Sequence, residues 1–261
     1  MLRLITFNVR SLRRPEALDL IINFMRTHGI HCAALQETWL PGSLVEQNKG
    51  FTIIRHNADG KAGERGGVAI LLDPLATEAW GRAGNATELL SRRCIGIKLR
   101  FTAKDNTQNT VCFISAYAPT SGHTDAECDA FHDTMADAVA WAAPTDILAL
   151  SGDFNASIGV CNKMDVDHQP NAATPDVGQY GIRHLNAAGR KLRAFAQMHN
   201  LRACTTFFKS QKRRHKKSRA SKTLRQQRHD DSRYRTWIHP RSRKPFQLDH
   251  IFVNQPEARR V

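Results

Sequence analysis

Apolar and β-branched residues occur along the chain in short runs that end at polar turns, which is the pattern of buried β-strands. Strands are predicted in this way at residues 2–9, 32–37, 51–55, 68–72, 94–101, 111–118, 146–151, 201–205, 234–238 and 247–253. Apolar positions spaced by three and four residues predict helices at residues 15–29, 126–142 and 186–200. This mixed order favours an α/β fold of two packed sheets with helices outside over a doubly wound parallel sheet.

Length and composition describe a single intracellular domain over residues 1–261. The chain has 261 residues, of which 41% are hydrophobic, enough for a substantial core. No apolar run approaches the roughly 20 residues of a membrane span, and the run at residues 1–7 is too short for a secretory signal. The six cysteines form no close pair of the kind that binds zinc, so we expect reduced thiols. Length and composition do not indicate an oligomeric state.

Positive charge is concentrated in one segment. Of the formal net charge of +14, residues 209–244 contribute +13, from fifteen Lys or Arg and two Asp. Residues 209–235 are therefore interpreted as a basic insertion, for which a phosphate-rich partner such as DNA is the expected ligand. Its candidate phosphate contacts are Arg213, Arg214, Lys216 and Lys217. A solvated loop or a nuclear-import signal would explain the same charge, and we expect a nuclear location.

Polar residues stand at the ends of several predicted strands. In chain order these residues are Asn8, Glu37, Tyr117, Asp153 and Asp249. If the strand ends converge, they build a pocket of carboxylates, amides and a phenol, a ligand set that suits Mg²⁺, or Mn²⁺ in its place. Such a cation neutralises a phosphate and activates a water. Each residue alone is weak evidence, because a single Glu is usually a surface charge and Gly-Asp-x-Asn is ordinary turn chemistry.

Six short motifs occur in a fixed order between residues 2 and 253: Thr6-Phe7-Asn8-Val9-Arg10, Leu35-Gln36-Glu37-Thr38, Tyr117-Ala118-Pro119-Thr120, Gly152-Asp153-Phe154-Asn155, Thr236-Trp237 and Gln247-Leu248-Asp249. This set resembles the endonuclease/exonuclease/phosphatase family, with its abasic-site endonucleases, deoxyribonuclease I-like enzymes and non-LTR retrotransposon endonuclease domains. Residues 178–192, with Asn186 and Gly189, are similar to retrotransposon-derived members and to craniofacial-development-protein-like sequences.

The resemblance implies a four-layer α/β sandwich with a phosphodiester-cleaving site at one end. It implies that Glu37 ligates the metal, with Asn8 beside it. Asp153 would handle the proton of the attacking water or of the leaving oxygen. Asn155 and Tyr117 would hold the phosphate.

The remaining roles concern the substrate and a histidine. The resemblance implies that Asp249 orients a histidine supplied from further along the chain. Asn186 is a candidate substrate contact, and Phe207 and Trp237 are candidates to flank the substrate. An aromatic residue at such a position is more often part of the core.

The sequence also departs from the family pattern. Arg10 stands where many nuclease members carry a small or acidic residue, and the stretch between Phe208 and Trp237 is longer and more basic than the family's. The family's closing Ser-Asp-His segment does not occur before Val261. We therefore expect a sandwich that lacks its final strand beside the N-terminal one, and an impaired nuclease.

Three histidines are possible substitutes for the missing one. His250 is a poor candidate, because neighbouring residues on a strand point to opposite faces and Asp249 is its neighbour. His184 and His239 lie in predicted loops and stay open as candidates.

The leading hypothesis is a Mg²⁺-dependent DNA endonuclease of retrotransposon type. One alternative is a non-catalytic nucleic-acid-binding remnant of such a domain. Another is a phosphatase of small phosphate esters or phosphoinositides on the same fold. The basic segment and residues 178–192 favour DNA over a lipid.

Overall fold

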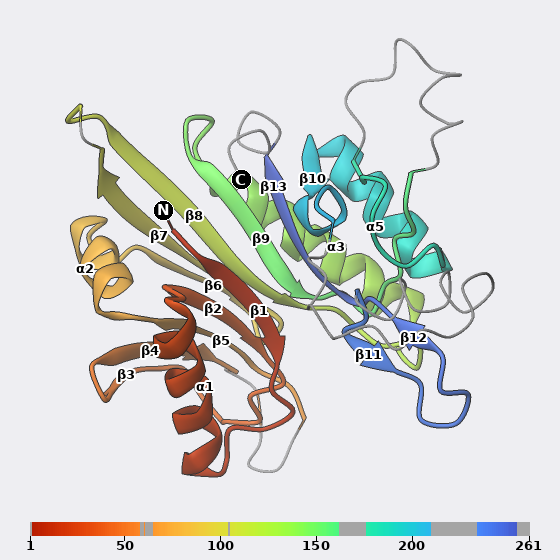
Figure 1. Ribbon diagram of the computed structural model, residues 1–261, viewed down its shortest axis with the longest axis horizontal. Helices are drawn as coiled ribbons and strands as arrows, with labels where there is room; N and C mark the ends of the chain where they lie inside the picture. The colour runs from red at the N-terminus through yellow and green to blue at the C-terminus, as the bar shows by residue number, and fades with distance from the viewer. Residues whose placement is uncertain are drawn as a thin grey trace, which may run out of the picture.

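Two β-sheets pack face to face, and each sheet is built from its own stretch of the chain, residues 4–72 for one and residues 87–254 for the other (Figure 1). The computed structural model describes residues 2–57, 60, 65–103, 105–161, 176–209 and 234–254. The five-stranded sheet has the order β1 (Leu4–Asn8), β2 (Cys32–Gln36), β5 (Val68–Leu72), β4 (Phe51–His56) and β3 (Leu44–Asn48). The six-stranded sheet has the order β10 (Leu201–Ala203), β13 (Asp249–Asn254), β9 (Ile147–Asp153), β8 (Gln108–Tyr117), β7 (Cys94–Thr102) and β6 (Thr87–Ser91).

Both sheets are mixed. Strands β1 and β2 are parallel, as are β8 and β9, and the other neighbouring strands are antiparallel. A separate hairpin consists of β11 (Trp237–Ile238) and β12 (Pro245–Phe246). The helices are α1 (Pro15–His28), α2 (Pro74–Arg82), α3 (Asp125–Ala140), α5 (Ala187–Met198) and the 3₁₀ helix η1 (Cys204–Thr206).

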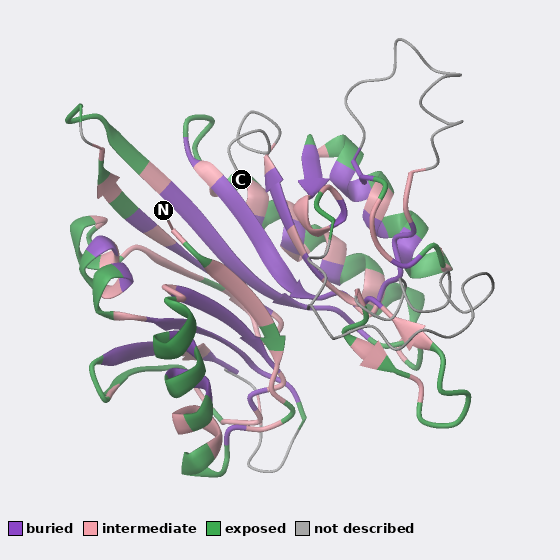
Figure 2. Cartoon of the chain, in the orientation of Figure 1, coloured by how far each residue is buried: buried purple, intermediate pink, exposed green. Residues whose placement is uncertain are grey.

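Helix α1 covers one outer face of the sandwich, and α3 and α5 cover the other (Figure 1). Strand β5 contributes alternate side chains to two different hydrophobic cores. Val68, Ile70 and Leu72 face the core between the sheets, whereas Ala69 and Leu71 face the core under α1. A strand covered on both faces needs an unbroken apolar run, and Figure 2 shows β5 buried along its length. The expected four-layer sandwich is confirmed.

The ends of α1 follow from its sequence. Pro15 occupies the first turn, where its missing N–H costs no hydrogen bond. Gly29 adopts a left-handed conformation with φ of 60° just after the last turn and ends the helix. The buried residues Ile21, Ile22 and Met25 form the stripe that packs on the sheet.

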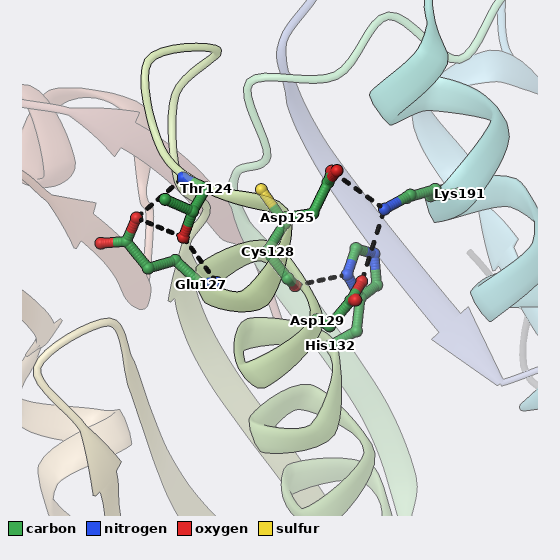
Figure 3. A network of polar contacts seen from close by, with 7 residues as sticks. All are labelled: Thr124, Asp125, Glu127, Cys128, Asp129, His132 and Lys191. Atoms are coloured by element: carbon green, nitrogen blue, oxygen red, sulfur yellow. Dashed lines mark hydrogen bonds and ion pairs between the residues drawn. The ribbon is translucent and has the colours of Figure 1, made fainter.

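Polar contacts join α3 and α5 on the molecular surface (Figure 3). Thr124 and Glu127 form a reciprocal capping box that begins α3. The Nζ atom of Lys191 on α5 lies 3.8 Å from Asp125 and 3.4 Å from Asp129 on α3. These side chains are exposed, so water screens the ion pairs, and buried apolar residues hold the two helices in place.

Strand β1 is an edge of the five-stranded sheet. Among the described residues β2 is its only neighbour. Phe7 on β1 is 54% exposed. No helix among the described residues is long and apolar enough to cross a membrane.

Candidate active site

The polar strand ends meet at the seam between the two sheets. Within the six-stranded sheet, Tyr117 of β8 lies opposite Asp153 of β9 in the parallel register. Asp153 in turn lies opposite Asp249 of β13 in the antiparallel register. On the other sheet, Asn8 ends β1 and Glu37 directly follows β2. The five side chains therefore come together because the strands that carry them end at the same edge.

The amide of Asn8 joins carboxylates from both sheets. Its Nδ2 donates hydrogen bonds to Oε1 of Glu37 and to Oδ2 of Asp153, each over 2.8 Å. Burial raises the pKa of Asp153, and the nearby Glu37 carboxylate raises it further. The hydrogen bonds from Asn8 and from the backbone N–H of Asn155 oppose that shift. One neutral amide thus holds two acids close together across the seam.

Asp249 adds an oxygen without a partner. Its Oδ1 is buried and makes no hydrogen bond to any described residue. Burial and, after it, the Asp153 carboxylate raise the pKa of Asp249 to about 7, while a hydrogen bond with the Thr236 side chain works against the shift. A buried, unpaired carboxylate oxygen costs free energy unless a cation or a donor approaches it.

Tyr117 contributes a protonated phenol. Its side chain is buried and hydrogen-bonds to Glu37. Burial raises the pKa of the phenol well above its usual value, and the charges of Glu37 and Asp153 add to this. The phenol therefore stays protonated throughout the physiological pH range and keeps a proton to direct at Glu37.

Two asparagines line the same space but also hold the local backbone. Asn155 has a φ of 47°, its N–H donates to Oδ1 of Asp153, and its Nδ2 donates to the carbonyl of Ala118 over 2.9 Å. Oδ1 of Asn186 accepts from the N–H of Ser157 over 3.1 Å and from that of Gly189 over 2.7 Å. Asn186 therefore caps α5 while its side chain borders the site.

All of these residues except Tyr117 line an open cavity of ≈ 1060 Å³, whose lining comprises a polar set, called the polar wall, and an apolar set, called the apolar wall. The polar wall carries Asn8, Glu37, Asp153, Asn155, Asn186 and Asp249. The other wall is largely apolar and comprises Phe7, Trp237, Ile238, Pro240, Phe246 and Leu248. Arg10 and Arg235 add positive charge at the lining. Most of the apolar wall comes from the β11–β12 hairpin and its flanks, of which only Trp237 was predicted from the sequence.

Phe207 and Trp237, the two aromatic residues predicted to flank the substrate, lie in different places. Trp237 lines the cavity, whereas Phe207 does not, and its ring lies 5.7 Å from the guanidinium of Arg202. Phe207 follows η1 directly, and its role beside the substrate stays a prediction. Arg213, Arg214, Lys216 and Lys217 lie outside the described residues.

None of the three candidate histidines lines the cavity. His250 is fully buried, its Nε2 lies 2.9 Å from the carbonyl oxygen of Ala156, and burial lowers its pKa to about 4. The ring of His184 contacts Phe246 at 5.4 Å, and that of His239 contacts Trp237 at 5.4 Å. Both loop histidines thus support the hairpin from outside the cavity.

The donor set fits a hard cation that keeps part of its water shell. No group of three or more His, Cys, Asp or Glu residues of metal-binding geometry occurs among the described residues. Mg²⁺ often takes only one or two carboxylates and completes its octahedron with water. Glu37 and Asp153 supply such carboxylates, and the side-chain carbonyl oxygen Oδ1 of Asn8 adds a neutral metal ligand. The unpaired oxygen of Asp249 is the kind of atom that a cation or its water would satisfy.

The fold and the site define an AP-endonuclease-like α/β sandwich. The catalytic domain of APE2 from Xenopus laevis superposes with a TM-score of 0.62 at 13% identity, over 98% of this chain and 83% of that one. The AP endonuclease LMAP from Leishmania major gives 0.62 at 15% identity, over 99% and 80%. Residues 5–261 match the model of the Endonuclease/Exonuclease/phosphatase family, and the chain belongs to this family.

A curated relative extends the comparison. Craniofacial development protein 2 of Bos taurus is 25% identical over 254 residues, which are 96% of this chain and 35% of that protein. The chain thus spans about a third of the length of that relative. Family membership supports a nuclease or phosphodiesterase type of function.

Proposed function

We propose that the protein is a divalent-metal-dependent phosphodiesterase that cuts DNA, of the retrotransposon endonuclease type. The observation that carries the proposal is the meeting of Glu37 and Asp153 on the Asn8 amide, next to the unpaired oxygen of Asp249. Crowded acids of this kind are costly in a folded protein and are typical of a site that receives a cation. The apolar wall beside them suits the sugar and base of a nucleotide.

Glu37 and the side-chain carbonyl of Asn8 would hold Mg²⁺, with Mn²⁺ as a substitute, and Asp153 beside them would accept the proton of the attacking water. A bound divalent cation supplies charge neutralisation for the phosphate and lowers the pKa of a coordinated water. In the absence of the cation, the two hydrogen bonds from Asn8 hold the Glu37 and Asp153 carboxylates close together. Tyr117 orients Glu37 through its phenolic hydroxyl.

Asp153 is placed to take the proton of the attacking water, because it is buried at the centre of the polar wall. Asn155 and Asn186 present amides to the phosphate from the same wall. Trp237 presents its ring to the nucleotide from the opposite side. The basic segment 209–235, most of which lies outside the described residues, is proposed to contact neighbouring phosphates by charge.

A plasmid-nicking assay with Mg²⁺ tests the proposal. The chain should convert supercoiled plasmid to the nicked form, EDTA should stop the reaction, and Asp153→Asn should slow it roughly 10²- to 10⁴-fold. Exposed Asp133→Asn on α3 is the matched control and should leave the rate unchanged. Nicking that survives both EDTA and Asp153→Asn would contradict the proposed site.

A non-catalytic DNA-binding role is the second candidate, because no histidine lines the described cavity. Salt-dependent binding to duplex DNA without nicking would favour it. Deletion of residues 210–232 should then flatten the dependence of log affinity on log salt, since each phosphate contact adds about 0.9 to that slope. Release of phosphate from phosphoinositide vesicles, with no action on DNA, would instead favour the lipid phosphatase alternative.

A further inference from the structure

Tyr117 is held by Arg93 at both its backbone and its ring. Arg93 directly precedes β7, and its carbonyl accepts the N–H of Tyr117 over 2.8 Å. Its guanidinium returns toward the same residue, with Nη1 3.4 Å from the carbonyl oxygen of Tyr117. The guanidinium carbon lies 5.2 Å from the centroid of the phenol ring. A planar cation at this distance is attracted to the electron-rich face of the ring.

The far end of the guanidinium is fixed as well. Nη2 of Arg93 lies 2.9 Å from Nε2 of His123. Arginine has donors only, so this imidazole nitrogen accepts. The other ring nitrogen, Nδ1, lies 3.0 Å from the hydroxyl of Thr120, a residue that lines the cavity. Arg93 therefore cannot rotate freely, and the ring of Tyr117 has a rigid neighbour on that side.

The charge of Arg93 is only partly solvated. Its side chain is half-buried, and burial lowers the pKa of the guanidinium. Its hydrogen-bond partners, the Tyr117 carbonyl and the His123 ring, are both neutral. The phenol ring and the Glu127 carboxylate both compensate the charge, and partial burial makes the ring contact stronger than it would be in water.

We propose that Arg93 is a positioning residue that fixes the ring of Tyr117 so that its hydroxyl stays on Glu37. Glu37 borders the cavity from the other sheet, so the chain His123, Arg93, Tyr117, Glu37 connects a surface turn to the candidate metal ligand. The effect on catalysis rests on the proposed function, whereas the effect on the phenol ring does not. Nothing in this role requires Arg93 to touch the substrate.

A double-variant cycle measures whether Arg93 acts through the phenol. Arg93→Met should lower kcat for nicking roughly tenfold, as expected for loss of a partly desolvated cation–π contact, with little change in KM. In a Tyr117→Phe background the same change should cost less than about twofold, because no hydroxyl remains to be positioned. Exposed Arg100→Met on β7 is the matched control and should have no effect. Losses that multiply in the double variant would overturn the proposal.

A measurement on the ring itself is independent of activity. The chain has three tyrosines, so the Tyr117 signal in ¹³C-tyrosine NMR is the one lost in Tyr117→Phe. Arg93→Met should shift that signal, and Arg93→Lys should restore it only in part because an ammonium stacks poorly. If Arg93→Met does not fold, Arg93→Lys carries both measurements. A Tyr117 signal unchanged in both variants overturns the positioning role, and a shifted signal in a chain that fails to nick DNA supports that role while rejecting the proposed function.

Discussion

Asp153 and Asp249 face each other directly across the β9–β13 pair, and burial raises the pKa of both; the Asp153 carboxylate raises that of Asp249 further, and the Glu37 carboxylate that of Asp153. Like charges at opposed positions of an antiparallel pair destabilise a sheet. The pair is nonetheless placed at the centre of the polar wall, so the fold retains an unfavourable contact at the site.

This pair should make stability fall as pH rises. Folding raises the pKa of Asp249 from about 4 to about 7, so the folded chain binds more protons between these pH values and stability is lost across that window. In Asp249→Asn the loss between pH 4.5 and pH 7.5 should be smaller by roughly 1–3 kcal/mol. Urea unfolding at both pH values measures it, with Asp133→Asn as the exposed control. An identical pH dependence in Asp249→Asn and the parent chain would contradict the raised pKa.

Addition of Mg²⁺ should stabilise the folded chain. A ligand that binds only the folded state at 100 times its Kd adds about 2.7 kcal/mol. We expect the Tm at pH 7.5 to rise with Mg²⁺ concentration, and this rise to disappear in Glu37→Gln, where one carboxylate charge is removed. Calorimetry with and without Mg²⁺ checks it. A Tm shift of equal size in Glu37→Gln would place the bound cation elsewhere.

Substitution of Asn8 should separate its role in folding stability, through hydrogen bonds to two carboxylates, from its role in cation binding. Asn8→Ala removes two hydrogen bonds to carboxylates and should cost about 2 kcal/mol of unfolding free energy. Asn8→Asp adds a third acid, so we expect a less stable chain without metal and a larger rise in Tm with Mg²⁺. Denaturation of both variants with and without the cation measures this. A Mg²⁺ response of Asn8→Asp no larger than that of the parent chain would count against a cation at this position.

The cap of α5 gives a further prediction. Asn186→Ala removes the acceptor for two backbone N–H groups and should destabilise the chain by about 1–2 kcal/mol. Asn186→Asp keeps the oxygen and should keep the stability, but it replaces the amide NH₂ with a charge that repels a phosphate. DNA affinity should therefore fall in Asn186→Asp at nearly unchanged Tm. Unaltered DNA affinity would limit Asn186 to its capping role.

Strongly apolar elements were predictable, and weakly buried ones were not. The sequence predicted α1 from Pro15 to Gly29 and the buried β5 because their patterns are long or unbroken. It did not predict β3, whose Leu44 and Val45 are exposed on an edge strand. Helix α2 was also missed, since only its caps and two buried alanines mark its 9 residues.

The candidate site follows the same division. Residues fixed by strand register, such as Tyr117 and Asp153, could be placed from the ends of apolar runs. Of the apolar wall only Trp237 was predicted beside the substrate, because the β11–β12 hairpin has just two residues in each strand. Phe207 does not line the cavity, and η1 interrupts the strand predicted before it.

The construction of the two sheets from separate stretches of the chain has a consequence for how the site is lost. Asn8 and Glu37 belong to the strand ends of the five-stranded sheet, whereas Asp153 and Asp249 belong to the six-stranded sheet. Neither sheet contains the full set of site residues, so the site exists only while the sheets are docked. Any fluctuation that parts them abolishes the site even if both sheets keep their secondary structure. A cation bound between Glu37 and Asp153 would link the two sheets to each other. Its dissociation would then be the first measurable sign that the sheets are separating.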